Sequence, residues 1–206
     1  MGRVVIVSNR LPITINRDKG ELIYYPSAGG LATGLNSLDS SLEKIWIGWP
    51  GQVVESEKER KAISSQFRKD HMAPVFLTAE EIKLFYEGFS NETIWPHFHY
   101  FTQYTTYSDA YWHAYQAVNE KFARVVLDLI QPGDMVWVHD YQLMLVPGML
   151  RAAVEDLSIG FFLHIPFPSY EIFRTLPWRE AILNGILGAD LIGFHTFGYM
   201  RHFLSA

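Results

Sequence analysis

The sequence predicts an α/β fold, a doubly wound and mostly parallel sheet of the Rossmann-like type. Two features of the chain support this prediction. Short apolar runs, which are typical of strands buried on both faces, recur along the chain, and each stops abruptly at polar or aromatic residues. Segments with helical periodicity lie between these runs, and alternating strands and helices are typical of a parallel sheet covered by helices.

Five strands are expected, in chain order, from these apolar runs. They are 4–7, 44–47, 136–138, 159–163 and 191–194, and they end at Ser8-Asn9-Arg10, Gly48-Trp49, His139-Asp140-Tyr141, His164 and His195. Ligands of open α/β sheets bind just beyond the carboxyl ends of the strands. The run that ends at Asp140 is the clearest, and we expect Asp140 to lie at a ligand site.

The clearest helix is expected at 111–130, where apolar residues recur at helical spacing behind Ser108, the expected N-cap. The apolar stripe consists of Ala114, Val118, Phe122, Val125, Val126 and Leu129. Segment 55–60 is interpreted as a solvent-facing helix surface, and 17–20 as a turn. Most aromatic residues are expected to be core; Phe122, Phe161, Phe162 and Phe194 are assigned to buried faces.

Composition limits the class of protein. The chain has 206 residues, of which 49% are hydrophobic and 19% charged, so a single domain spanning 1–206 is expected. No apolar run approaches the ~20 residues that cross a bilayer, and no secretory leader is evident. The net charge of −5 argues against a nucleic-acid partner, and the absence of cysteine fits a reducing cytoplasm.

A glycine-rich segment at 27–35 is expected to open a helix. Adjacent Gly29 and Gly30 would let backbone N–H groups converge on an anion at the helix N-terminus. The spacing G-G-x-x-x-G matches neither the dinucleotide fingerprint nor the P-loop, so a simple tight turn is the alternative for these two residues.

Several motifs, in this order along the chain, resemble those of the trehalose-6-phosphate synthases. They are VSNRLP at 7–12, GGL at 29–31, IGW at 47–49, FYEGFSN at 85–91, WP at 95–96, FHY at 98–100, VHDYQL at 138–143 and GFFLHIPFP at 160–168. The resemblance covers nearly the whole chain, and the last motif is the most distinctive.

The resemblance implies a retaining glycosyltransferase with two Rossmann-like domains, the GT-B fold, of which this chain would be the N-terminal, acceptor-side half. Such enzymes transfer glucose from UDP-glucose to glucose 6-phosphate, giving α,α-trehalose 6-phosphate and UDP. By resemblance, the acceptor would be held by Arg10, Tyr86, Trp95 and Asp140 with Trp49 beside it, and the donor by Gly29, Gly30 and His164. Asp140 and His164 would be the catalytic residues.

These assignments have a physical basis, but each residue also has an alternative structural role. The guanidinium of Arg10 offers a fork to a phosphate, although a surface Arg often pairs a nearby carboxylate instead. The carboxylate of Asp140 can accept hydrogen bonds from sugar hydroxyls, or it can cap a helix that starts near Leu143. His139 is assigned to structure, because neighbours on a strand point to opposite faces and it should not act together with Asp140.

No metal or cofactor is expected. The histidines His97, His99, His139, His164 and His195 show no metal-ligand spacing. No second carboxylate is evident beside Asp140, so the reaction is expected to proceed on one face of the donor sugar, with the departing UDP phosphate taking the acceptor proton.

The domain that would hold the donor nucleotide is not evident in this sequence. Only 196–206 follow the last strand, so the chain alone is expected to be inactive or nearly so and to need a C-terminal partner domain. The oligomeric state is left open. Two other functions are considered. One is a non-catalytic or regulatory synthase-like domain. The other is a dinucleotide-dependent oxidoreductase, and the absence of a G-x-G-x-x-G motif argues against it.

Overall fold

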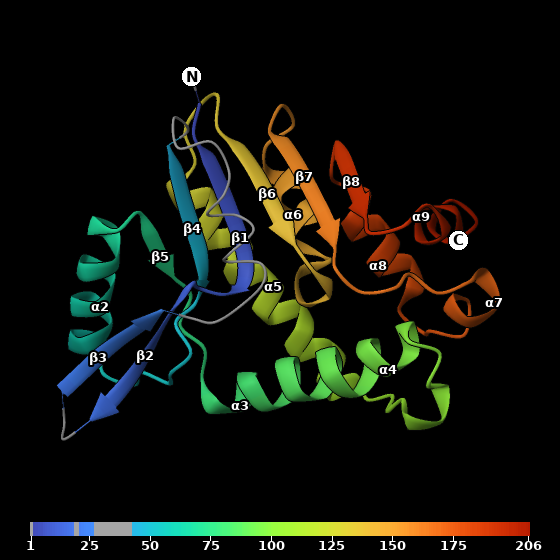
Figure 1. Ribbon diagram of the computed structural model, residues 1–206, viewed down its shortest axis with the longest axis horizontal. Coiled ribbons are helices and arrows are strands. Elements are labelled where there is room, and N and C mark those ends of the chain that lie inside the picture. Colours follow the sequence, from blue (N-terminus) through green and yellow to red (C-terminus); the bar gives the residue numbers. More distant parts are fainter. Residues whose placement is uncertain (1, 19–20, 27–42) are drawn as a thin grey trace.

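The computed structural model describes residues 2–18, 21–26 and 43–206, and its centre is a six-stranded sheet in the order β5-β4-β1-β6-β7-β8 (Figure 1). The strands are β1 (Val4–Arg10), β4 (Lys44–Trp49), β5 (Met72–Pro74), β6 (Met135–His139), β7 (Ser158–Leu163) and β8 (Leu191–Phe194). All neighbouring strands in this sheet are parallel. The predicted fold class and all five predicted strands are confirmed.

Three further strands were not predicted. β5 has only three residues and includes Pro74, which gives too short a run to stand out in the sequence. β2 (Ile13–Asp18) and β3 (Glu21–Pro26) form a separate antiparallel hairpin. Asp18 pairs with Glu21 across the turn predicted at 17–20, of which residues 19–20 lie outside the described part.

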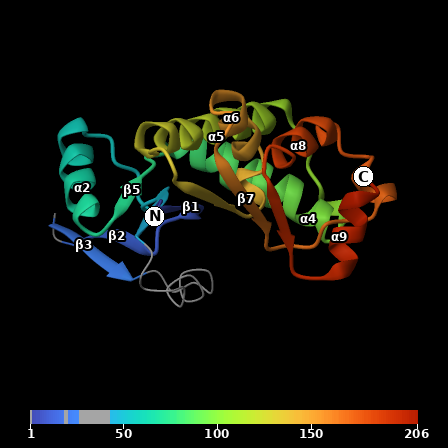
Figure 2. The same cartoon turned by 90° about the horizontal axis from the view of Figure 1, so that it is seen from above.

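Helices connect the strands. They are α2 (Glu57–Lys69), α3 (Ala79–Glu81), η1 (Ile82–Ile94), α4 (Trp95–Phe98), η2 (Thr102–Tyr104), α5 (Asp109–Leu129), η3 (Tyr141–Leu143), α6 (Val146–Ala153), α7 (Tyr170–Phe173), α8 (Arg179–Ile186) and α9 (Phe197–Leu204). Figure 2 shows α5, α6 and α8 together on one face of the sheet. No helix in the described ranges is long and apolar enough to cross a membrane.

Alternation along the strands divides the core in two. Val5 and Val7 of β1 belong to the large cluster that includes α5, α6 and α8, whereas Ile6 belongs to a smaller cluster with Trp46 and Phe67. The two faces of the sheet are therefore both packed, which explains why the strands are apolar at nearly every position.

The predicted helix at 111–130 corresponds to α5, which begins two residues earlier and ends one residue earlier. Val118, Phe122 and Val126 of the predicted stripe are fully buried. Ala114, Val125 and Leu129 are half-buried against the core. Ser108 occupies the N-cap position, but its side chain makes no capping hydrogen bond.

Two sequence-based burial assignments need correction. Phe122 and Phe161 are buried as predicted, but Phe162 and Phe194 are only half-buried, because β7 and β8 lie towards one edge of the sheet. In segment 55–60, α2 begins only at Glu57, and the Arg60 side chain is partly buried. Its Nε donates to the carbonyl of Val54.

Candidate functional site

The order of the strands places the switch point of the sheet between β1 and β6. From β1 the chain crosses to β4 on one side, and from β6 it crosses to β7 on the other side. At such a switch point the connections after the two central strands diverge, and ligands of α/β proteins bind in the gap at the carboxyl ends. Arg10 ends β1 and Asp140 follows β6, so the fold brings these two predicted residues to the carboxyl ends of neighbouring strands at the switch point.

Asp140 has a strained backbone. Its φ of 76° and ψ of 170° lie in a region that is essentially restricted to glycine, at a cost of about 1–3 kcal/mol for other residues. Two hydrogen bonds hold it there: its N–H donates to the carbonyl of Phe162 (2.8 Å), and its Oδ1 accepts from the N–H of His164 (3.0 Å). Strain that is maintained by the surrounding fold is concentrated at functional sites.

The carboxylate of Asp140 does not cap a helix. Only its main-chain carbonyl accepts from Leu143, and the side chain makes no capping bond to η3. Asp140 thus occupies the N-cap position of η3 without a side-chain capping bond, which leaves its carboxylate available for another role. Burial raises the pKa of Asp140 to about 6, and hydrogen bonds from Tyr141 and His164 together with the nearby His195 only partly offset this effect.

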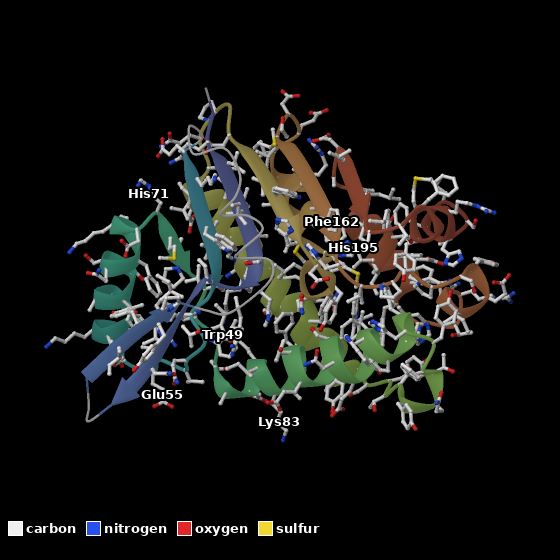
Figure 3. The ribbon with its side chains drawn as sticks, in the orientation of Figure 1. Trp49, Glu55, His71, Lys83, Phe162 and His195 are labelled. Carbon is white, nitrogen blue, oxygen red and sulfur yellow. The ribbon has the colours of Figure 1, made fainter. Side chains whose placement is uncertain are left out.

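Three histidines that are distant in the sequence lie together beyond β6, β7 and β8. His139 Nδ1 is 3.1 Å from His164 Nε2, and the His164 and His195 rings have centroids 5.4 Å apart. Figure 3 shows Phe162 and His195 close together beside the ends of β7 and β8. Burial lowers the pKa of His164 to about 4, with a further contribution from His195.

His139 and Asp140 make no hydrogen bond to each other among the described residues, as expected for a pair that does not act directly, but both contact His164. His139 contacts the His164 ring and Asp140 binds the His164 main chain. Strand alternation fails here because Asp140 leaves the extended conformation, so its side chain no longer follows the alternation of β6.

Arg10 and Trp49 form one unit at the ends of β1 and β4. The Arg10 guanidinium lies over the Trp49 ring, 4.7 Å from its centroid, and is exposed to solvent. Trp49 itself is buried, and its Nε1 donates to the carbonyl of Gln52. The indole therefore supports the guanidinium from below, and a cation–π contact of this kind restricts the side chain before a ligand arrives.

The π-helix η1 brings Tyr86 and Trp95, the residue directly after its end, to one side. In an α-helix, at about 3.6 residues per turn, nine residues would place them on opposite sides. η1 has the wider i to i−5 pattern, and the Trp95 N–H continues it by bonding to the carbonyl of Ser90. At roughly 4.4 residues per turn, nine residues make about two full turns. Tyr86 is half-buried and Trp95 is 42% exposed.

Tyr141 is a site residue that the sequence analysis missed. Its hydroxyl donates to Oδ1 of Asn91 in η1 (3.0 Å), and its pKa is raised by burial, by Asp140 and by Tyr86. This bond joins the loop after β6 to the π-helix. The available signal was its position directly after Asp140 in the VHDYQL motif.

Helix α5 fixes the loop that carries Asp140. The buried Tyr115 hydroxyl donates to the carbonyl of Tyr141 (2.7 Å) and accepts from the N–H of Met144 (3.1 Å). Asn119 donates to the carbonyl of Gln142 (3.0 Å) and accepts from the N–H of Leu145 (3.1 Å). The loop backbone thus finds its partners on α5, which is why a long helix must precede β6.

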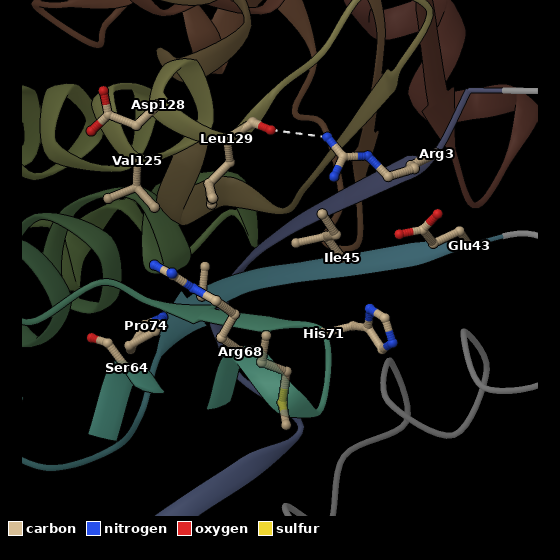
Figure 4. Close-up of a pocket in the computed structure, with 12 residues that line it drawn as sticks. Arg3, Glu43, Ile45, Ser64, Arg68, His71, Pro74, Val125, Asp128 and Leu129 are labelled. Atoms are coloured by element: carbon tan, nitrogen blue, oxygen red, sulfur yellow. Dashed lines mark hydrogen bonds between the residues drawn. The ribbon is translucent and has the colours of Figure 1, made fainter. Parts of the chain in front are cut away.

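A cavity of about 520 Å³ lies at the opposite end of the sheet (Figure 4). Arg3, Glu43 and His71 line it, and they precede β1, β4 and β5 rather than follow them. Arg3 is occupied by a 2.6 Å ion pair with Asp134. None of the buried unpartnered polar atoms found in the described ranges lines this cavity. The candidate site is therefore the carboxyl edge of the sheet at the switch point, and not this cavity.

Two further predictions concern the glycine-rich turn and a metal site. Gly29 and Gly30 lie outside the described residues. Within residues 2–18, 21–26 and 43–206, no group of three or more histidine or acidic side chains is arranged to hold a metal ion.

Comparison with known proteins shows extensive similarity. Residues 2–206 match the family model of glycosyltransferase family 20. The chain is 48% identical, over 98% of its length, to a bifunctional trehalose-6-phosphate synthase/phosphatase from Thermoproteus tenax. It is also 48% identical, over its whole length, to the 56 kDa subunit of the UDP-forming α,α-trehalose-phosphate synthase from Kluyveromyces lactis.

Solved structures give the same result. A UDP-forming α,α-trehalose-phosphate synthase from Burkholderia xenovorans, in complex with glucose-6-phosphate, matches 98% of this chain with a TM-score of 0.79 and 33% identity. The N-terminal domain of a trehalose-6-phosphate phosphatase from Candida albicans matches all of it, with a TM-score of 0.81 and 32% identity. The chain spans 28% of the Thermoproteus protein, 43% of the Kluyveromyces protein and 42% of either solved chain.

Proposed function

The chain belongs to glycosyltransferase family 20, and on that premise we propose that it forms the acceptor-side domain of a trehalose-6-phosphate synthase. The reaction proposed is glucosyl transfer from UDP-glucose to glucose 6-phosphate. The observation that carries the proposal is the strained Asp140 at the switch point of the sheet, with the exposed Arg10 at the end of the neighbouring strand β1. The family match does not support the oxidoreductase alternative.

In this proposal the acceptor is held by groups with complementary roles. Arg10, supported by the Trp49 ring, binds the 6-phosphate through charge-assisted hydrogen bonds. Tyr86 and Trp95 offer aromatic surface to the pyranose from one face of the π-helix. The Asp140 carboxylate accepts hydrogen bonds from sugar hydroxyls and orients the acceptor.

The donor is proposed to contact His164, Gly29 and Gly30, with the nucleotide bound by a second domain outside this chain. His164 is well placed for this role because its main chain is fixed by Asp140 and its ring by His139. The expected cytoplasmic location and the absence of a metal and of a nucleic-acid partner stay predictions from the sequence.

The proposed chemistry retains the anomeric configuration. The groups that shift the pKa of Asp140 include no second carboxylate, so a double displacement through a glycosyl–enzyme intermediate has no evident partner in the described residues. In the front-face alternative, the bond from C1 to the UDP oxygen breaks while C1 bonds to the acceptor oxygen. The acceptor proton passes to the departing phosphate, and the protein contributes orientation and charge stabilisation.

A calorimetric or NMR titration of this chain with glucose 6-phosphate tests the acceptor half of the proposal. We expect saturable binding that needs the phosphate, so glucose and NAD should not replace it, and that is lost in Arg10→Ala. Arg68→Ala is the matched control, because Arg68 is also exposed but lines the cavity at the opposite end. Binding that survives Arg10→Ala, or no binding by the folded chain, would overturn this assignment.

A second candidate is a non-catalytic, regulatory domain of the same fold. One observation favours it: the similar Candida albicans structure is the N-terminal domain of a protein named as a phosphatase. A longer protein that carries this chain separates the two candidates. UDP release from UDP-glucose that depends on glucose 6-phosphate and falls in Asp140→Ala supports the synthase; no release by the folded protein supports the regulatory domain.

A further inference from the structure

His164 is held from two sides by two consecutive residues. The Asp140 carboxylate binds its main-chain N–H, and His139 Nδ1 lies 3.1 Å from its ring Nε2. His139 is only 1% exposed and packs against the Trp137 ring, with centroids 4.6 Å apart. The contact between the rings is therefore fixed on the His139 side by the core of the sheet.

The bond between the two rings contains a single proton. Burial lowers the pKa of His139 to about 3 and that of His164 to about 4, so both imidazoles are neutral near pH 7 and each has one N–H. Either His139 donates through Nδ1 to His164, or His164 donates through Nε2 to His139. The two arrangements leave opposite groups exposed on His164.

The second ring nitrogen of His139, Nε2, shows which of the two proton arrangements is favoured. His139 Nε2 is buried and has no hydrogen-bond partner among the described residues. If His164 were the donor, the proton of His139 would sit on Nε2 as a buried, unpaired N–H, and orphaned buried N–H groups are rarer than under-satisfied acceptors. With His139 as the donor, Nε2 instead carries only an unpartnered lone pair, which costs less than a buried N–H without an acceptor.

We propose that His139 is a positioning residue: it donates its Nδ1 proton to Nε2 of His164 and so leaves the Nδ1–H of His164 as the ring's donor. His164 Nδ1 makes no hydrogen bond within the described residues and is not among their fully buried unpartnered atoms, so it is free to bond to a ligand. Its partner would be an oxygen that accepts, such as a sugar hydroxyl or a phosphate oxygen.

This inference deepens the proposed function and rests on it for the identity of the ligand. A His164 ring with its lone pair occupied by His139 cannot take a proton from the acceptor. The ring would orient the donor sugar, and proton acceptance would remain with the departing phosphate. His139 acts through His164 and touches neither substrate.

The test is ¹⁵N NMR of the histidine rings in this chain, without any substrate. We expect His164 to be the tautomer protonated at Nδ1. His139→Leu removes the donor at similar volume, and this tautomer preference should be lost. His139→Asn keeps an amide N–H close to the position of Nδ1 and should restore it. Melting temperatures of both variants show whether they fold.

The outcomes separate the two proposals. A wild-type His164 protonated at Nε2, or a folded His139→Leu whose His164 keeps the wild-type tautomer, overturns the positioning role and leaves the glucose 6-phosphate titration unaffected. If His139→Leu does not fold, the positioning role is tested by the spectra of the wild type and of His139→Asn, both of which should show His164 protonated at Nδ1. The expected tautomer without any sugar phosphate binding would instead support the positioning role and count against the proposed function.

Discussion

At the scale of single residues, Asp140 combines three properties that are individually unfavourable: a glycine-like backbone, burial, and a carboxylate without a salt bridge among the described residues. A residue that served stability alone would be expected to relieve at least the backbone strain. The fold instead maintains it through hydrogen bonds to Phe162 and His164. Function is the simplest reason for an aspartate here.

The strain predicts an unusual order of stability between two variants. Asp140→Gly and Asp140→Ala both lose the carboxylate, but only Gly relieves the backbone, so Asp140→Gly should be more stable by about 1–3 kcal/mol. Urea denaturation measures both free energies of unfolding. Gln116, exposed in the middle of α5, is the control, because there Gly should be less stable than Ala by about 0.5–1 kcal/mol. The same order at both positions would contradict the strain.

The pKa of Asp140 predicts a pH-dependent penalty. Because burial raises it from 3.8 to about 6, the folded state binds more protons than the unfolded state between these values. The contribution of Asp140 is therefore most favourable below pH 4 and is lost as the pH rises through 6, by on the order of 3 kcal/mol. Asp140→Asn should match the wild type at pH 4 and exceed it in stability at pH 7. A difference that does not change with pH would show that the carboxyl titrates normally.

At the scale of elements, the π-helix η1 is the feature that organises the site. Its buried residues include Phe85, Phe89 and Ile94, spaced by four and five, as the wider turn requires. Tyr86, Asn91 and Trp95 form a second row, in which the intervals between residues are five and then four. The buried row and this second, less buried row thus both follow the π pattern. Gly88 makes the packing possible, because a Cβ there would lie 2.8 Å from the Tyr111 ring of α5.

This geometry predicts that Tyr86 and Trp95 serve one ligand. Tyr86→Ala and Trp95→Ala should each weaken glucose 6-phosphate binding by about tenfold or more, or ~1.4 kcal/mol. Glu87→Ala should leave the dissociation constant unchanged, since Glu87 is exposed and follows Tyr86 by one residue, on another face of η1. Calorimetry gives all three constants. An effect of only one of the two aromatic residues would mean that they do not share a site.

At the scale of the whole molecule, the carboxyl edge of the sheet is held in place by the helix layer. The loop after β6 depends on Tyr115 and Asn119 of α5 and on Asn91 of η1. The loop after β7 depends in turn on Asp140. Binding groups from β1, η1, β6 and β7 therefore share one framework, which limits their relative motion.

Removing one of the hydrogen bonds that hold the loop after β6 should lower the free energy of unfolding of the whole chain. Tyr115→Phe leaves the carbonyl of Tyr141 and the N–H of Met144 buried without their partner. Each unpaired group should lower the free energy of unfolding by about 1–3 kcal/mol. Tyr111→Phe, on the same helix, loses only an exposed bond to Glu92 and should cost less than about 0.5 kcal/mol. Denaturation midpoints compare them; equal losses would show that the loop is held by other contacts.

The sequence alone determined the parallel α/β fold, the five long strands and the positions where they end. It could do so because burial on both faces makes such strands apolar at nearly every position, so that their ends at Arg10, Asp140 and His164 stand out. It also placed α5 within two residues, because its buried stripe recurs at the ordinary helical spacing.

Only the tertiary structure decided which of these ends meet and how. The order β5-β4-β1-β6-β7-β8 places the switch point between β1 and β6, and no local pattern encodes that neighbourhood. The positive φ of Asp140 overrides strand alternation and lets it share His164 with His139. The π-helix turns Tyr86 and Trp95 to one side, where α-helical spacing would have separated them. Asp140 and the π-helix η1 both depart from the ordinary geometry of strands and α-helices. Long-range packing and hydrogen bonds compensate the free energy that these local departures cost.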